Sequence, residues 1–166
     1  MIEIRGARPD DDAALVAIDE ATWSEATTPA PRQTGPWAFL DRFPLENVLV
    51  GTIDGVVAGY ALVSNPLPVP SHAHVLQLNG LAVGPGFTGH GLGRALVEAA
   101  VATATERGAR KITLRVLGSN AVARHLYASC GFVEEGVLQE EFLLGGAYVD
   151  DVFMARRLVP AGSSSA

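Results

Sequence analysis

The feature that most constrains this chain is a strand, a glycine-rich turn and a helix that follow one another from residue 75 to residue 106. Residues 75–83 alternate apolar and polar side chains well enough to predict a strand. Residues 84–93 contain five glycines, which interrupt regular structure. From Leu92 onward, apolar residues recur at helical spacing until Gly108 ends the pattern. The rest of the chain is arranged around this unit.

The glycines of this turn favour an anion site. They let backbone N–H groups approach a ligand closely, and the first helical turn has unpaired donors at the positive end of its dipole. The combination predicts phosphate or pyrophosphate binding, although a tight strand-to-helix connection would use the same glycines. Gly84-x-Gly86-x-x-Gly89 also satisfies the dinucleotide fingerprint. The helix begins only after Gly91, however, and Glu106 falls at a helix end, so the dinucleotide interpretation is disfavoured.

Length and composition exclude several classes of protein. The 166 residues fit one domain with one core. No apolar run is long enough to cross a bilayer and residues 1–5 do not begin a signal peptide, so we expect a cytoplasmic protein without membrane association. Cys130 is the only cysteine, and His72 and His74 lack a third ligand, so no metal site is expected. A net charge of −6 excludes a nucleic-acid footprint and modestly favours cationic substrates.

The remaining segments read as alternating strands and helices. Further strands are predicted at residues 2–5, 48–53, 56–63, 111–117, 132–138 and 147–158, and further helices at 9–21, 37–43 and 121–130. The order β-α-α-β-β-β-α-β-α-β-β predicts an α/β single domain over residues 1–158, with a mixed, mostly antiparallel sheet flanked by helices. Residues 159–166 have nothing to bury and are predicted to form a disordered tail.

Two motifs resemble the GNAT superfamily of acyl-CoA-dependent N-acetyltransferases. Thr88-Gly89-His90-Gly91-Leu92-Gly93 is similar to the signature Q/R-x-x-G-x-G/A, with Thr88 in place of the usual Gln or Arg. Residues 120–132 resemble the pattern N-x-x-A-x-x-x-Y-x-x-x-G-F. The predicted element order resembles the same family. The resemblance therefore implies the GNAT fold and acetyl-CoA as the cofactor.

The resemblance also implies where coenzyme A binds. In the family the loop amides bind the pyrophosphate, and the strand before the loop pairs with the pantetheine arm. The residues implied here are Leu81, Ala82, Val83, Thr88, Gly89, His90, Gly91, Leu92, Gly93, Arg94, Asn120 and Arg124. Arg94 and Arg124 are the candidates to meet phosphates, and each is equally compatible with a solvated surface charge.

The second motif implies a general acid. Helical spacing places three motif positions on one face: Asn120, Ala123 or Arg124, and Tyr127. In the family the Tyr hydroxyl lies by the thioester sulfur. A phenol with a pKa near ~10 is protonated at neutral pH and can donate to a leaving thiolate. Without the motif, Tyr127 would be interpreted as an aromatic side chain that packs on the sheet.

The central strand departs from the family at the position of the base. Many GNAT enzymes have a Glu there, whereas this chain has Gln77, whose amide is not a useful proton acceptor. We therefore expect Gln77 or Asn79 to hold a water that relays the proton. Backbone N–H groups at residues 81–83 are expected to polarise the thioester carbonyl.

The acceptor pocket is predicted outside the two motifs. Residues 146–154 look like the closing strand of phosphinothricin-type and ribosomal-protein-type acetyltransferases. Asp150 and Asp151 point to opposite faces of that strand, so at most one faces the pocket. The residues expected to bind the acceptor are Trp37, Asn79, Tyr148 and Asp150.

The expected function is transfer of an acetyl group from acetyl-CoA to a primary amine of a small molecule. A protein N-terminal acetyltransferase is one alternative. A catalytically silent acyl-CoA-binding module is another, and it gains weight from Gln77. The identity of the amine, the length of the acyl chain, the source of the base and the existence of a homodimer remain open.

Overall fold

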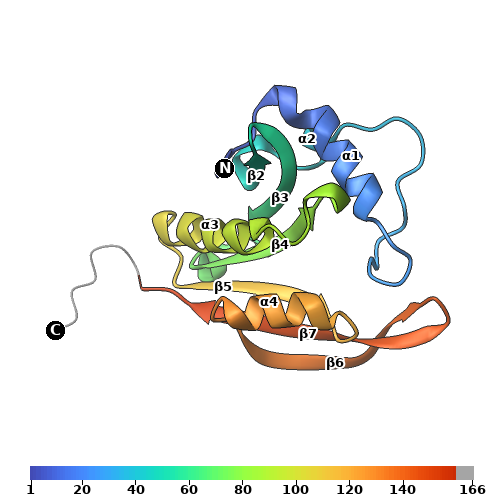
Figure 1. The fold of residues 1–166 in the computed structure, drawn as a ribbon. Helices are drawn as coiled ribbons and strands as arrows, with labels where there is room; N and C mark the ends of the chain where they lie inside the picture. Colours follow the sequence, from blue (N-terminus) through green and yellow to red (C-terminus); the bar gives the residue numbers. More distant parts are fainter. Residues whose placement is uncertain (160–166) are drawn as a thin grey trace.

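The structure, a computed structural model, describes residues 1–159. Residues 160–166, most of the predicted tail, lie outside the described residues. The elements follow the predicted order (Figure 1): β1 (Ile2–Gly6), α1 (Asp12–Thr22), α2 (Phe39–Arg42), β2 (Val48–Ile53), β3 (Val56–Ser64), β4 (Val75–Val83), α3 (Leu92–Glu106), β5 (Lys111–Leu117), α4 (Ala121–Ser129), β6 (Val133–Leu144) and β7 (Ala147–Arg157). Short 3-10 turns lie at Pro9–Asp11, Leu45–Asn47, Pro70–His72 and Pro85–Phe87.

All seven strands form one sheet in the order β1-β2-β3-β4-β5-β7-β6. Neighbouring strands are antiparallel except β4 and β5, which are parallel. The predicted hairpin between β2 and β3 is present, because Asp54 and Gly55 adopt φ angles of 50° and 81°, as a tight hairpin turn requires. The predicted α/β fold with a mostly antiparallel sheet is confirmed.

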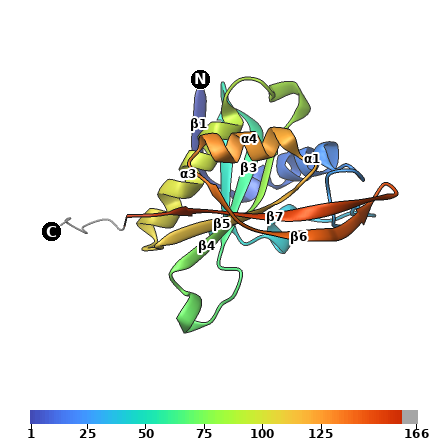
Figure 2. The ribbon, with the colours of Figure 1, turned by 90° about the horizontal axis from the view of Figure 1, so that it is seen from below.

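Helices cover both faces of the sheet (Figures 1 and 2). On one face, α3 and α4 pack on a core that includes Leu96, Leu114 and Tyr127. On the other face, α1 and α2 cover a smaller core around Leu15 and Phe39. Strands β2, β3 and β4 contribute side chains to both cores, as period-two alternation allows, whereas β5 and β7 contribute only to the first.

Glycine in β3 lets α3 lie close against the sheet. A Cβ on Gly59 would lie 2.6 Å from the carbonyl oxygen of Ala82 and 3.2 Å from Leu92 Cδ2. Leu92, the first residue of α3, is 1% exposed beneath this contact. The start of α3 is therefore anchored beside the end of β4.

The sheet opens between β4 and β5. These strands pair only where Val75–Gln77 faces Lys111–Thr113, although β4 continues to Val83 and β5 to Leu117. A bulge at Asn79 shifts the register between β3 and β4 at the same level, and bulges bend the strand that carries them. Beyond Gln77 the two strands separate, and the halves of the molecule diverge there (Figure 1).

Two segments differ from the sequence prediction. The strand predicted at residues 132–138 continues to Leu144, because a bulge between Leu138 and Phe142 interrupts the alternation without ending the pairing. Within the bulge, Glu140 has a φ of 52°, and its N–H donates to Asp150 Oδ1 at 2.8 Å. The predicted helix at residues 37–43 is only four residues long, and packing of Phe39 against Tyr60, with ring centroids 4.8 Å apart, holds it.

The helices give no sign of a membrane span. Within residues 1–159, none of them combines the length and the hydropathy needed to cross a bilayer.

Candidate active site

A cavity of about 510 Å³ lies where β4 and β5 separate. Four segments far apart in the sequence build its wall: β4, β5 with the start of α4, the loop after α1, and the β6–β7 hairpin. Its lining residues are Thr27, Pro29, Gln77, Leu78, Asn79, Gly80, Leu81, Arg115, Val116, Leu117, Asn120, Ala123, Tyr127, Phe142 and Asp151.

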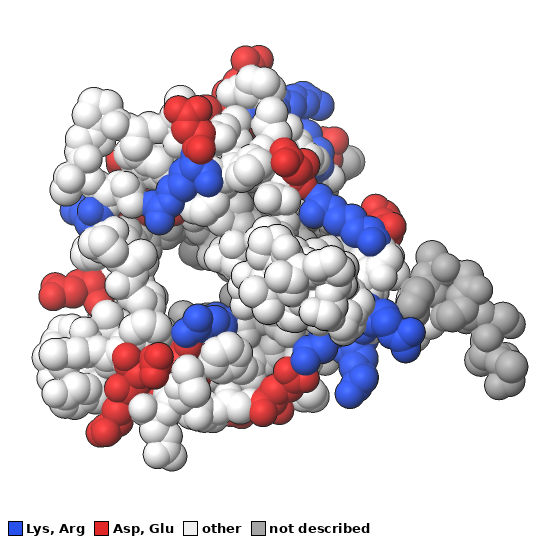
Figure 3. Space-filling view, turned by 180° about the vertical axis from the view of Figure 1, so that it is seen from behind, with Lys and Arg blue, Asp and Glu red and all other residues white. Residues whose placement is uncertain are grey.

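A second cavity of about 470 Å³ adjoins the first on the side of α1. The two share five lining residues, Thr27, Asn79, Gly80, Leu81 and Asn120. In the second cavity the Tyr60 hydroxyl donates to Asp19 Oδ1 at 2.6 Å. Together the cavities hollow the molecule around the bulge of β4, and Figure 3 shows an opening between its two halves.

Tyr127 projects from α4 toward the first cavity and is 8% exposed. Burial, followed by the neighbouring Cys130, raises the pKa of Tyr127 to about 12. No hydrogen-bond partner for its hydroxyl is found among residues 1–159, and no fully buried side-chain oxygen there lacks a partner. The hydroxyl is therefore a protonated donor that is open to the cavity.

The start of α4 brings the other motif residues to the same cavity. Asn120 caps the helix, because its Oδ1 accepts from the Ala123 N–H at 3.1 Å. Asn120, Ala123 and Tyr127 all line the cavity. Arg124 does not, since its guanidinium donates to the Gly118 carbonyl at 3.1 Å and contacts Glu134 at 3.3 Å.

The polar residues of β4 lie at the point where the sheet opens. Gln77 is half-buried, faces Thr113 in the last pair of the parallel ladder and lines the first cavity. Asn79 is exposed at the bulge and lines both cavities. Both residues that we expected to hold a relay water therefore border the cavity that Tyr127 lines.

The glycine turn leaves its amides free. Gly89 and Gly91 have φ angles of 79° and 85°, and a Cβ on either would meet nothing within 4 Å. Gly91 is the N-cap of α3 and supplies no side-chain cap. Thr88 Oγ1 donates to Pro85 at 3.3 Å, and His90 Nδ1 lies 2.9 Å from the Thr88 carbonyl. These side chains fold back on the turn, so its outward donors are backbone N–H groups.

The last residues of β4 connect the cavity to this turn. Leu81 lines both cavities and Ala82 lines the second. Val83 Cγ2 would lie 3.9 Å from a Cβ on Gly93, at the start of α3. The edge of β4 that faces β5 has no ladder partner after Gln77 within the described chain. A strand edge with unpaired amides therefore leads from the cavity to the turn.

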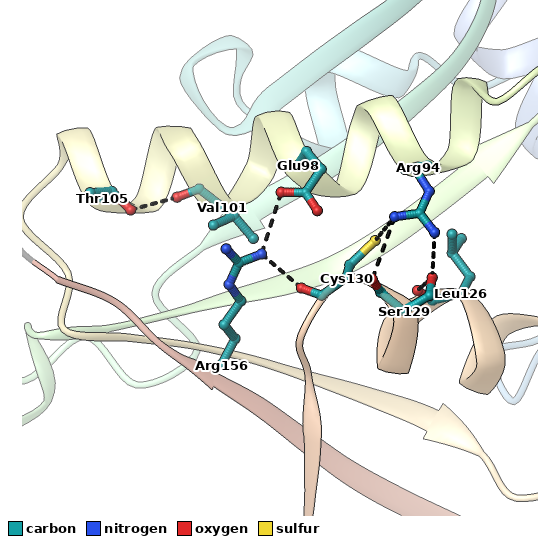
Figure 4. Close-up of polar contacts among 8 residues, drawn as sticks. All are labelled: Arg94, Glu98, Val101, Thr105, Leu126, Ser129, Cys130 and Arg156. Atoms are coloured by element: carbon teal, nitrogen blue, oxygen red, sulfur yellow. Dashed lines mark hydrogen bonds and ion pairs between the residues drawn. The ribbon is translucent and has the colours of Figure 1, made fainter.

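Arg94 lies between α3 and α4 (Figure 4). Its Nη2 donates to Ser129 Oγ at 2.8 Å, and its Nη1 donates to the Ser129 carbonyl at 3.4 Å. Beside it, Arg156 donates to the Cys130 carbonyl at 2.7 Å and pairs with Glu98 at 3.3 Å. These contacts tie α3 to the end of α4 and occupy the guanidinium that we expected to meet a phosphate.

The structure does not bring three of the predicted acceptor residues to the cavity. Trp37 Nε1 donates to Glu20 at 3.1 Å, away from the first cavity. Tyr148 is 68% exposed. Asp150 lies with Tyr148 in a separate depression of about 300 Å³, where it holds the bulge of β6. Strand alternation instead turns Asp151 toward the cavity.

Sequence reasoning missed several lining residues. Thr27 and Pro29 belong to a loop without a motif, and only tertiary structure brings that loop to β4. Phe142 follows a bulge that hid its register. Arg115, one of three polar residues that alternate with apolar ones in β5, was the one available signal.

His72 and His74 lie on the segment that leads into β4. The His72 and His74 rings are 6.4 Å apart, and His72 Nδ1 lies 3.3 Å from Asn65 Oδ1. No group of three or more potential metal ligands occurs in the part of the chain that the structure describes.

Comparison with known proteins gives consistent matches over this site. The model of the Acetyltransferase (GNAT) family matches residues 14–132. An uncharacterized N-acetyltransferase of Mycobacterium tuberculosis is 30% identical over 161 residues, which cover 90% of this chain and 99% of the relative. A GCN5-related N-acetyltransferase structure from Kribbella flavida has a TM-score of 0.85 at 26% identity, over 95% of this chain and 98% of that one.

A structure from Salmonella typhimurium, described with its cofactor acetyl-CoA, has a TM-score of 0.83 at 24% identity over 100% of this chain and 99% of that one. This likeness concerns the fold. The residues that the family model matches include β4, the glycine turn, α3 and α4, which carry the features described above. The chain belongs to the GNAT family of acetyltransferases.

Proposed function

We propose that this protein transfers an acetyl group from acetyl-CoA to a primary amine of a small molecule, with Tyr127 as the general acid. The observation that carries the proposal is the opening between β4 and β5, where a buried, protonated phenol faces a cavity. An acyl transfer needs a proton donor for the leaving thiolate and polar groups around the carbonyl. Both lie at this opening.

The chain has a suitable place for each part of coenzyme A. The uncapped first turn of α3 and the turn from Thr88 to Gly93 supply backbone donors for a pyrophosphate. The unpaired edge of β4 supplies amides for an extended, amide-containing arm. The Asn120 side chain borders the cavity beyond that edge. Acetyl-CoA, when bound, contributes the activated acetyl group.

Tyr127 is suited to donate a hydrogen bond to the leaving sulfur. Its pKa of about 12 keeps the phenol protonated at neutral pH. A free alkyl thiol has a pKa near ~8.5, so its thiolate is a weaker base than the phenolate. Proton transfer from Tyr127 to the thiolate is therefore uphill at equilibrium. In the transition state, however, a hydrogen bond from the hydroxyl stabilises the developing charge.

The acceptor must lose a proton to attack the carbonyl. Gln77 and Asn79 border the cavity, and neither amide takes up a proton itself. We propose that their amides position a water that carries the proton to solvent through the open side of the cavity. The cavity is walled by the loop after α1 and by the β6–β7 hairpin, which suits a small acceptor better than a folded protein.

The test is a screen of purified protein with acetyl-CoA against amino acids, polyamines, aminoglycosides and N-terminal peptides, with release of the free thiol as the readout. We expect turnover with at least one small amine, and mass spectrometry should show the acetylated product. Turnover of N-terminal peptides alone would favour a protein acetyltransferase. Binding of acetyl-CoA without turnover of any amine would favour the silent binding module.

A further inference from the structure

The cavity that Tyr127 lines contains one buried carboxylate. Asp151 is 2% exposed and is the only acidic residue among the lining residues of this cavity, while Arg115 is the only basic one. A carboxylate buried to this degree is costly unless its charge is compensated. The hydrogen-bond partners of Asp151 therefore decide whether either of its oxygens is free to bind a ligand.

Arg115 compensates one side of this carboxylate. The Nε and Nη2 atoms of Arg115 both donate to Asp151 Oδ2, the first at 2.7 Å. The Arg115 guanidinium lies 4.9 Å from the centre of the Phe153 ring, which holds it in place. Because both donors share Oδ2, the ion pair does not use the second oxygen of Asp151.

The second oxygen of Asp151 is open to the cavity. Within residues 1–159, no donor is found for Oδ1, and no fully buried side-chain oxygen lacks a partner. Oδ1 is therefore reached from outside, and Asp151 lines the cavity. The structure presents one negatively charged oxygen there without a partner.

Asp151 and Tyr127 reach the cavity from opposite faces of the sheet. Val152 and Met154 point into the core under α3 and α4, which also contains Tyr127. Strand alternation turns Asp151 and Phe153 to the other face, together with Arg115, which pairs with Phe153 across β5 and β7. The opening between β4 and β5 connects the two faces, so a thioester in that opening would have the phenol on one side and the carboxylate on the other.

We propose that Asp151 Oδ1 binds the acceptor's amino group as an ammonium cation, which makes Asp151 the residue that selects cationic primary amines. The inference rests on the proposed function and adds the acceptor class to it. Phe142 and Pro29 border the same cavity and provide apolar contact for the carbon next to the nitrogen. The ammonium then gives up a proton to solvent before its nitrogen attacks.

The test compares Asp151→Asn with Asp11→Asn. Asp11 is a matched control because it is also nearly buried, at 6% exposed, and it is paired with Arg5 at 2.7 and 2.8 Å outside either cavity. Loss of one charge-assisted hydrogen bond should raise the acceptor KM of Asp151→Asn by about 10- to 100-fold. The acetyl-CoA Kd should stay within about twofold, as the carboxylate is placed at the acceptor side.

The control separates binding from folding. Asp11→Asn should lose stability in urea unfolding but keep the wild-type acceptor KM. An unchanged acceptor KM in folded Asp151→Asn would overturn the inference, as would an equal weakening of acceptor and acetyl-CoA binding. Asp151→Glu retains the charge and should recover part of the loss.

A measurement on the wild type covers the case in which Asp151→Asn does not fold. The N,N-dimethyl derivative of the amine substrate keeps the positive charge but cannot form a stable amide. The alcohol with the same carbon skeleton lacks the charge. We expect the dimethyl derivative to compete with the amine at least about 10-fold better than the alcohol. Equal inhibition would overturn the inference.

Failure of the proposed transferase function can be distinguished from failure of the inference about Asp151. If no amine is acetylated, the amines of the screen are titrated by NMR against the wild type and Asp151→Asn, both with coenzyme A. Binding that is lost only in the variant supports Asp151 as a cation site in a protein without transferase activity. Equal binding, or no binding by the wild type, overturns the inference.

Discussion

At the scale of single residues, the hydroxyl group of Tyr127 differs from that of the other buried tyrosine, Tyr60, in what surrounds it. Tyr127 and Tyr60 are both nearly buried, and burial raises the pKa of each. The Tyr60 hydroxyl is committed to Asp19, whereas the Tyr127 hydroxyl faces the cavity. Only the Tyr127 hydroxyl is therefore free to donate a hydrogen bond to a substrate.

Replacing Tyr127 with Phe removes this donor and little volume. We expect kcat to fall by about 10²-fold, as for the loss of one general acid, with the acetyl-CoA Kd nearly unchanged. Steady-state kinetics and calorimetry would measure the two effects. Tyr148→Phe removes a hydroxyl from a 68% exposed side chain outside the cavity, and it should retain wild-type kcat. A Tyr127→Phe enzyme with wild-type kcat would show that the thiolate leaves without help from the phenol.

At the scale of elements, α3 has a glycine in left-handed backbone just outside each of its ends. Gly91 precedes the helix with a φ of 85°, and Gly108 follows it with a φ of 81°; a Cβ on either meets nothing within 4 Å. Left-handed backbone costs an L-residue roughly 1–2 kcal/mol at either position. The same substitution therefore causes similar strain at both ends of one helix, but only one end faces the proposed coenzyme A site.

Gly91→Val should weaken acetyl-CoA binding by at least about 10-fold, because the strained residue displaces the amides that meet the pyrophosphate. Gly108→Val should lower the free energy of unfolding by an amount similar to that in Gly91→Val, but it should keep the wild-type Kd for acetyl-CoA. Calorimetric titration and urea unfolding of both variants would measure these quantities. Normal acetyl-CoA affinity in folded Gly91→Val would contradict the assignment of this turn.

At the scale of the whole molecule, the proposed coenzyme A site joins the two halves that separate between β4 and β5. The halves share the short ladder between Val75–Gln77 and Lys111–Thr113, the core beneath α3 and α4, and polar contacts from α3 to α4 and β7. A ligand that lies along β4 and reaches α4 binds the native state and not the unfolded chain.

Acetyl-CoA should therefore raise the melting temperature. At a concentration of 100 Kd the stabilisation is about 2.7 kcal/mol, which corresponds to a shift of roughly 5–11 °C for a domain of this size. Differential scanning calorimetry would measure it. Tyr127→Phe should keep the shift, while Gly91→Val should lose about half of it or more at the same concentration. The absence of a shift in the wild type would contradict binding across the opening.

The sequence by itself determined the features that depend on local spacing. The glycines of residues 84–93, the Asp54-Gly55 turn and the periodicity of the strands and helices each act over a few neighbouring residues, so the element order could be predicted. The placement of Asn120, Ala123 and Tyr127 on one face follows from helical geometry for the same reason.

Only the tertiary structure decided how the cavity is completed. Asp150 and Asp151 are neighbours of the same type, and the pairing register of β7 decides that Asp151 faces Arg115 while Asp150 supports a bulge. Thr27 reaches β4 because packing of α1 and α2 on the sheet carries its loop there. Register and loop position depend on contacts between residues distant along the chain, and the spacing of neighbouring residues does not encode them.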